Sequence, residues 1–156
     1  MTDYTNAKNW PAYITNNMSD KKLKFVRLNG ELHPYAIVRE GAFPQAPKGF
    51  IGCHPNTQFF FISDEVPERF RDLFVAHEVY EYALEGGPDG KGNCLKALFY
   101  ELSLIPENIR KEYLPYRRDF FARMVAFYEG NDEFYTRRNN IRESFKYLKS
   151  IEASDG

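Results

Sequence analysis

Hydrophobic and polar positions divide the chain into a β-prone first part and a helical second part. The runs KLKFVRL and ELHPYAIVRE flank Asn29-Gly30 and predict a hairpin, because both turn residues tolerate the positive φ of a type I′ turn. Residues 50–53 and 58–62 predict a second strand pair, and the apolar run FFFIS indicates a strand that is covered on both faces. We therefore expect a small antiparallel sheet.

From Pro67 onward, the apolar positions recur at helical spacing. Pro67 begins the first predicted helix and Gly86-Gly87-Pro88 ends it. Three more helices are predicted over residues 93–105, 106–130 and 132–149, and Pro115 is expected to kink or divide the middle one. A sheet followed by about four helices is the α+β arrangement.

Length and composition indicate one globular domain. The chain has 156 residues, and 43% of them are hydrophobic, enough for a substantial core. Residues 1–20 are interpreted as a polar N-terminal arm, in which Trp10, Tyr13 and Ile14 could dock one helical turn, and residues 21–156 as a single α+β domain. The aromatic fraction of 17% is high, so rings must form much of the core.

Charge and cysteine content exclude several classes of protein. The net charge of -1 argues against a nucleic-acid-binding surface. No secretory leader and no run of 18 apolar residues is present, so we expect a cytoplasmic protein without a membrane span. Cys53, His54 and Cys94 fit no zinc motif, and the two cysteines are interpreted as reduced thiols rather than as a Cys/His site.

The C-terminal helices carry a basic cluster that is interleaved with acidic residues. We interpret it as a solvated helical face, with a weak site for an acidic partner as the alternative. Its members are Arg110, Lys111, Arg117, Arg118, Arg123, Arg137, Arg138, Arg142, Lys146 and Lys149.

The candidate site lies in the second half of the first predicted helix, in the segment AHEVYEY. His77 and Glu81 are four residues apart, so their side chains share one face, and that face is the apolar one. Glu101 occupies an equally apolar stripe of the next helix. A tight Gly-rich connection makes the two helices antiparallel neighbours, so the three ionisable side chains could converge. Buried groups of this kind need a mutual hydrogen bond, a metal ion or a shifted pKa.

The segment HEVYE resembles the H-E-x-x-H helix of zincin metallopeptidases, in particular the gluzincin branch, whose third metal ligand is a Glu on a following helix. The resemblance covers residues 59–101 and implies a zincin-like core. It implies His77, Glu81 and Glu101 as metal ligands and Glu78 as the general base. The expected reaction is metal-assisted hydrolysis of a peptide or amide bond, in an active enzyme or an inactive descendant.

The fifth motif position is Glu81 where zincins have histidine. A His/Glu/Glu set is rich in oxygen, so it would suit Mn, Fe or Mg at least as well as Zn.

Two alternative functions that need no metal ion stay open. One is acid/base chemistry by the buried pair. The other is a non-catalytic binding, immunity or adaptor protein, in which His77 and Glu81 form a structural hydrogen bond completed by Tyr80 or Tyr82. An accessory subunit with an aromatic interface is a further possibility, and the sequence does not determine the oligomeric state.

Overall fold

The computed structural model describes residues 3–53, 59–85, 93–129 and 135–155, and it confirms the α+β class. Four strands form one mixed sheet: β1 (Lys24–Leu28), β2 (Glu31–Val38), β3 (Ile51–Cys53) and β4 (Phe60–Ser63). The strand order is β1-β2-β4-β3. The hairpin at Asn29-Gly30 is confirmed, since both residues have positive φ, 51° and 81°.

The predicted antiparallel sheet is wrong at one interface. β1 with β2 and β3 with β4 are antiparallel pairs, as expected, but β2 and β4 pair in parallel, with Tyr35 opposite Phe60. The parallel pair arises because the 21 residues between these strands return the chain to the same end of the sheet before β4 begins, and β3, which belongs to this connection, lies at the outer edge of the sheet.

The helices follow the predicted order. The main ones are α2 (Glu68–Val79), α3 (Cys94–Ser103), α4 (Arg110–Tyr128) and α5 (Tyr135–Asp155), with α1 (Ala12–Thr15) near the N-terminus. Short 3-10 turns η1 (Ala7–Asn9), η2 (Glu40–Ala42) and η5 (Glu107–Ile109) complete the chain, and α2 continues into a π-helical turn, η3 (Tyr80–Glu85). Helix α4 is not divided at Pro115. None of the described helices is long and apolar enough to span a bilayer.

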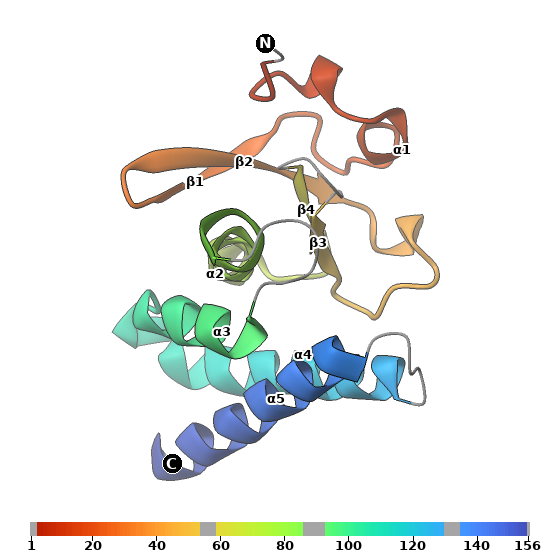
Figure 1. Ribbon diagram of the computed structural model, residues 1–156. Helices are drawn as coiled ribbons and strands as arrows, with labels where there is room; N and C mark the ends of the chain where they lie inside the picture. Colours follow the sequence, from red (N-terminus) through yellow and green to blue (C-terminus); the bar gives the residue numbers. More distant parts are fainter. Residues whose placement is uncertain (1–2, 54–58, 86–92, 130–134, 156) are drawn as a thin grey trace.

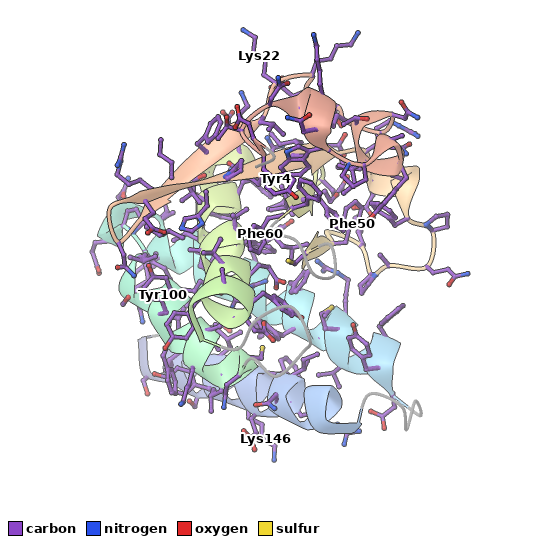
Figure 2. The ribbon with its side chains drawn as sticks, turned by 45° about the horizontal axis from the view of Figure 1, so that its top comes forward. Tyr4, Lys22, Phe50, Phe60, Tyr100 and Lys146 are labelled. Carbon is purple, nitrogen blue, oxygen red and sulfur yellow. The ribbon has the colours of Figure 1, made fainter. Side chains whose placement is uncertain are left out.

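Helix α2 lies at the centre of the molecule, with the sheet on one side and α3, α4 and α5 on the other (Figure 1). Its buried residues include Phe70, Phe74 and Val79. Side chains fill the space between these layers: Phe60 lies in the interior, whereas Lys22 and Lys146 lie at opposite ends of the molecule (Figure 2). Residues 73–77 of this helix are all buried, so a polar side chain in this part of it must find a partner inside the protein.

The other face of the sheet is covered by the N-terminal residues. Alternate residues of β2 point to opposite faces: Tyr35 and Ile37 belong to the core around α2, whereas Ala36 and Val38 pack with Ile14 in a second, smaller cluster. Trp10 joins that cluster and Tyr13 is 46% exposed. The N-terminal segment therefore contributes two core side chains to the fold.

Candidate metal centre

His77 and Glu81 meet where helix α2 changes into the π-helical turn η3. Both residues are buried, 2% and 7% exposed, and His77 Nε2 lies 3.4 Å from Glu81 Oε2. The spacing of four residues brings them together, as the sequence predicted. Single π turns within α-helices frequently occur at functional sites.

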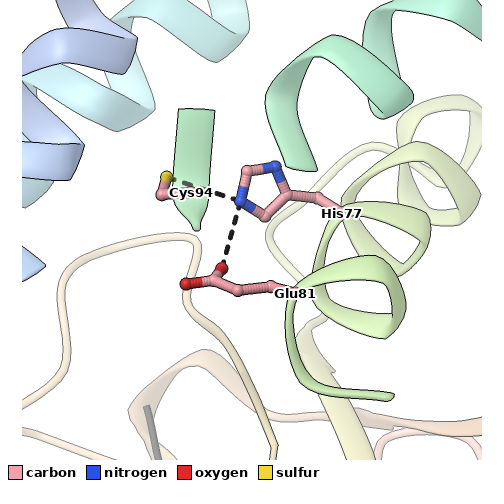
Figure 3. Close-up of side chains that lie close together, drawn as sticks. All are labelled: His77, Glu81 and Cys94. Carbon is pink, nitrogen blue, oxygen red and sulfur yellow. Dashed lines mark hydrogen bonds and ion pairs between the residues drawn. The ribbon is translucent and has the colours of Figure 1, made fainter. Parts of the chain in front are cut away.

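Cys94 joins this pair from the beginning of α3. The preceding residue, Asn93, caps the helix by accepting a hydrogen bond from the backbone N–H of Lys96, which fixes Cys94 in the first turn. The Cys94 Sγ lies 3.5 Å from His77 Nε2 and accepts a hydrogen bond of 3.3 Å from the Ser144 hydroxyl. Glu81 and Cys94 therefore both face the same ring nitrogen (Figure 3).

Glu101 contacts the other nitrogen of the same ring. Its carboxylate is fully buried, and Oε1 lies 2.9 Å from His77 Nδ1. Arg117 binds the carboxylate in a bidentate manner, with Nε 2.8 Å from Oε2 and Nη2 2.9 Å from Oε1. The Tyr113 hydroxyl donates a short hydrogen bond to Oε2. Glu101 is therefore anchored in three directions and fixes the orientation of the imidazole.

The charges in this cluster shift the pKa values of its members. Burial alone would raise the pKa of Glu101, but the Arg117 guanidinium and the bond to His77 lower it. Burial would lower the pKa of His77, yet its contacts with Cys94, Glu101 and Glu81 raise it well above the usual value. Burial and the neighbouring Glu101 charge raise the pKa of Tyr113, so its hydroxyl stays protonated.

The cluster forms part of the wall of a cavity of about 280 Å³. His77, Glu81, Cys94 and Glu78 all line it, together with Arg117. Most of the other lining side chains are apolar or aromatic: Ile51, Phe61, Phe120, Phe121, Met124 and Ile141, with Cys53, Tyr82 and Tyr128 as weakly polar members. Glu78 acts electrostatically on two of these neighbours: burial and then its charge raise the pKa of Cys53 to about 12 and also raise that of Tyr128.

The structure brings all four sequence-predicted site residues into one region, but it does not group them as the zincin resemblance implies. Within the described part of the chain, donor atoms of His77, Glu81 and Cys94 lie within 4.8 Å of one another. Glu101 lies on the opposite side of the imidazole, with both oxygens already bonded to Arg117, Tyr113 and His77. The third potential ligand beside His77 and Glu81 is therefore a thiol rather than a carboxylate.

Sequence reasoning missed Tyr113 and Arg117, and the basic-face interpretation was wrong for Arg117. Arg117 is 1% exposed, whereas its neighbour Arg118 has a side chain that is 35% exposed. The signal was present in the spacing, because Tyr113, Arg117 and Phe121 are each four residues apart and share one buried face of α4. Glu101 was predicted as a site residue because it is a charged residue within the apolar stripe of a helix. Arg117 meets the same criterion.

Cys94 was the other omission. The sequence pointed to it only weakly. Asn93 is a typical N-cap residue and places Cys94 in the first turn of α3, the helix that packs against α2. The Tyr113 hydroxyl bonds Glu101, and the sequence did not single it out.

Comparisons with known proteins give no relative from which a function could be transferred. No protein-family model, no curated protein and no solved structure matches the chain. The zincin resemblance stays a prediction that rests on the residues of this chain alone.

Proposed function

We propose that the chain is a metal-dependent hydrolase of peptide or amide bonds, with the metal held by His77, Glu81 and Cys94. The separation of the donor atoms carries this proposal. In a tetrahedral zinc site the bond lengths imply about 3.4 Å between nitrogen and oxygen ligands and about 3.5 Å between nitrogen and sulfur ligands. The corresponding distances from His77 Nε2 are 3.4 Å to Glu81 Oε2 and 3.5 Å to Cys94 Sγ. A direct hydrogen bond between an imidazole and a carboxylate is normally near 2.9 Å, so the first distance fits ligand spacing better.

Glu101 supports the same assignment from behind the imidazole. Histidine ligands usually donate their second ring N–H to a carboxylate, which fixes the tautomer and leaves the other nitrogen free to bind the metal. His77 Nδ1 lies 2.9 Å from Glu101 Oε1, and Arg117 and Tyr113 hold that carboxylate in place. In this proposal Glu101 orients a ligand and is not itself one.

The donor set favours zinc over the harder metals. A thiolate from Cys94 and a carboxylate from Glu81 together neutralise a divalent ion. His77, whose pKa is raised in the metal-free cluster, would release its proton to the solvent and bind as neutral imidazole. Sulfur and nitrogen ligands select zinc, whereas Mg and Mn prefer sites made of oxygen. Replacing the expected second carboxylate by a thiol therefore shifts the metal preference toward Zn.

With three protein ligands, a fourth position would be left for substrate or water, as in catalytic zinc sites. The metal would polarise a carbonyl group and activate water for attack on it. Glu78 lines the same cavity and would accept the proton of the attacking water. Tyr128, whose raised pKa keeps its hydroxyl protonated, is a hydrogen-bond donor that lines the same cavity.

Metal analysis of untagged protein tests the proposal. We expect one equivalent of zinc in the wild type, and loss of it in His77→Ala and Cys94→Ser. Cys53→Ser is the matched control, because Cys53 lines the same cavity but does not belong to the donor cluster. Substoichiometric metal that none of these substitutions changes would refute the metal site.

Glu78→Gln tests the catalytic role separately. We expect the variant to keep its metal and to lose hydrolysis of a mixed peptide library, read by mass spectrometry. Hydrolysis equal to that of the wild type would remove Glu78 from the mechanism.

A second candidate function is a non-catalytic binding protein with a purely structural cluster. The observation that favours it is that side chains of the protein are bonded to both ring nitrogens of His77, and that three side chains are bonded to Glu101. For this candidate, we expect no metal in the purified wild type and a loss of stability when His77 is replaced.

A further inference from the structure

Arg117 is a buried cation in the wall of the cavity, and the proposed metal site does not use it. Its Nε and Nη2 both bind Glu101. Its guanidinium carbon lies 4.0 Å from the centre of the Phe74 ring, 4.8 Å from that of Phe120 and 4.7 Å from that of Phe121. The ion pair and the three rings hold the guanidinium rigidly.

One nitrogen of this group is left over. Arg117 Nη1 is buried and has no hydrogen-bond partner among the described residues. An unpaired buried donor typically costs about 1–3 kcal/mol, and more when it is charged, so proteins rarely retain one without a use. Because Nε and Nη2 are bound to Glu101 and Arg117 lines the cavity, Nη1 is the nitrogen of this wall residue that is left for a bound molecule to engage.

The rest of the cavity wall restricts what that molecule can be. Glu78 and Glu81 also line the cavity, and the Arg117 charge is already compensated by Glu101, so a second anion would be repelled. A neutral amide fits instead, because its oxygen can accept from Nη1 and its N–H can donate to a carboxylate. The apolar side chains Ile51 and Met124 suit a nonpolar substituent.

We propose that the cavity binds a neutral amide with an apolar substituent, and that Arg117 Nη1 donates to the amide oxygen. This deepens the proposed function by naming the group that is recognised, but the hydrogen bond does not require the metal. The volume of about 280 Å³ is the space of roughly nine waters, sufficient for benzamide, a molecule of about nine non-hydrogen atoms.

NMR titration of the ¹⁵N-labelled protein tests the proposal directly. Benzamide is added to the protein as purified and again after dialysis against a chelator, while the side-chain N–H signals of Arg117 are followed. We expect saturable shifts of these signals in both samples, and binding of benzoate at least about tenfold weaker, because it brings a charge near Glu78 and Glu81. Unmoved Arg117 signals at benzamide concentrations that shift other cavity residues would overturn the proposal, as would tighter binding of benzoate.

A pair of variants gives an independent test. Arg117→Lys keeps a cation beside Glu101 but lacks the second terminal nitrogen, so benzamide should bind about 10- to 100-fold more weakly. Arg118→Lys, one residue further along α4 and paired with Glu152, should bind as the wild type does. Equal affinity in the two variants would overturn the proposal, and if Arg117→Lys does not fold, the wild-type titration decides.

The two proposals fail separately. Benzamide binding with Arg117 shifts in a protein that contains no metal would contradict the hydrolase and support the amide site. A zinc-containing protein whose Arg117 signals do not shift on addition of benzamide would support the metal site and contradict the amide site.

Discussion

Replacing Arg117 by methionine should expose how strongly the buried ion pair contributes to stability. Methionine is similar in length but has no charge, so Glu101 would keep Tyr113 and His77 as partners and lose both bonds to the guanidinium. Removing one partner of a buried pair typically destabilises a protein by about 3–5 kcal/mol. We expect the lower end, about 3 kcal/mol, because two contacts to the carboxylate remain. For a chain of this length, that corresponds to a fall in Tm of about 6–12 °C.

Urea unfolding of metal-free protein, followed by circular dichroism, measures this difference. The matched control is Arg118→Met, since the Arg118 side chain is 35% exposed and its ion pairs with Asp119 and Glu152 lie at the surface. Surface pairs are worth about 0–1 kcal/mol, so the control should lose at most that amount. Equal losses in the two variants would refute the assignment of Arg117 as the buried anchor of the site.

Three further predictions concern pH, the N-terminal segment and the cavity wall. The pKa of Glu101 is lowered in the folded protein, so its stabilising effect is complete above the ordinary value of 4.5 and is lost as pH falls through the lower folded value. The stability difference between wild type and Arg117→Met should therefore shrink in acid, and a constant difference would contradict the ion pair. Ile14 is fully buried, so Ile14→Ala should cost about 2–5 kcal/mol in urea unfolding; a loss below 1 kcal/mol (of the order of a surface change) would show that the N-terminal segment is not part of the core. A Cβ on Gly52 would lie 2.6 Å from the Phe61 ring, so Gly52→Ala should cost about 1–3 kcal/mol and alter benzamide binding, and an unchanged Tm would contradict that packing.

Much of the fold could be predicted because local patterns determine it. The turn at Asn29-Gly30 and the helical spacing after Pro67 depend on neighbouring residues only, and both predictions are confirmed. The parallel pairing of β2 with β4 depends on how the intervening chain returns, which no local pattern records. Pro115 lies in the second turn of α4, where its missing N–H removes one hydrogen bond while the buried neighbours Tyr113 and Leu114 hold the helix.

The site residues that the sequence predicted are ionisable residues at positions where the helical pattern expects an apolar one. His77, Glu81 and Glu101 are ionisable groups in apolar stripes, and all three are buried around one imidazole. Which ring nitrogen each carboxylate contacts depends on how α3 and α4 pack against α2, and this tertiary packing is not determined by local sequence patterns. Cys94 could not be identified in this way, because a free cysteine within an apolar stripe is an ordinary core residue.

X-ray absorption at the zinc edge shows whether His77, Glu81 and Cys94 hold a metal ion. We expect one sulfur neighbour of the zinc at about 2.3 Å and nitrogen or oxygen neighbours at about 2.0–2.2 Å in the wild type and in Cys53→Ser. The sulfur neighbour should vanish in Cys94→Ser. A wild-type spectrum without a sulfur neighbour, or a sulfur signal that persists in Cys94→Ser, would show that Cys94 does not bind the metal.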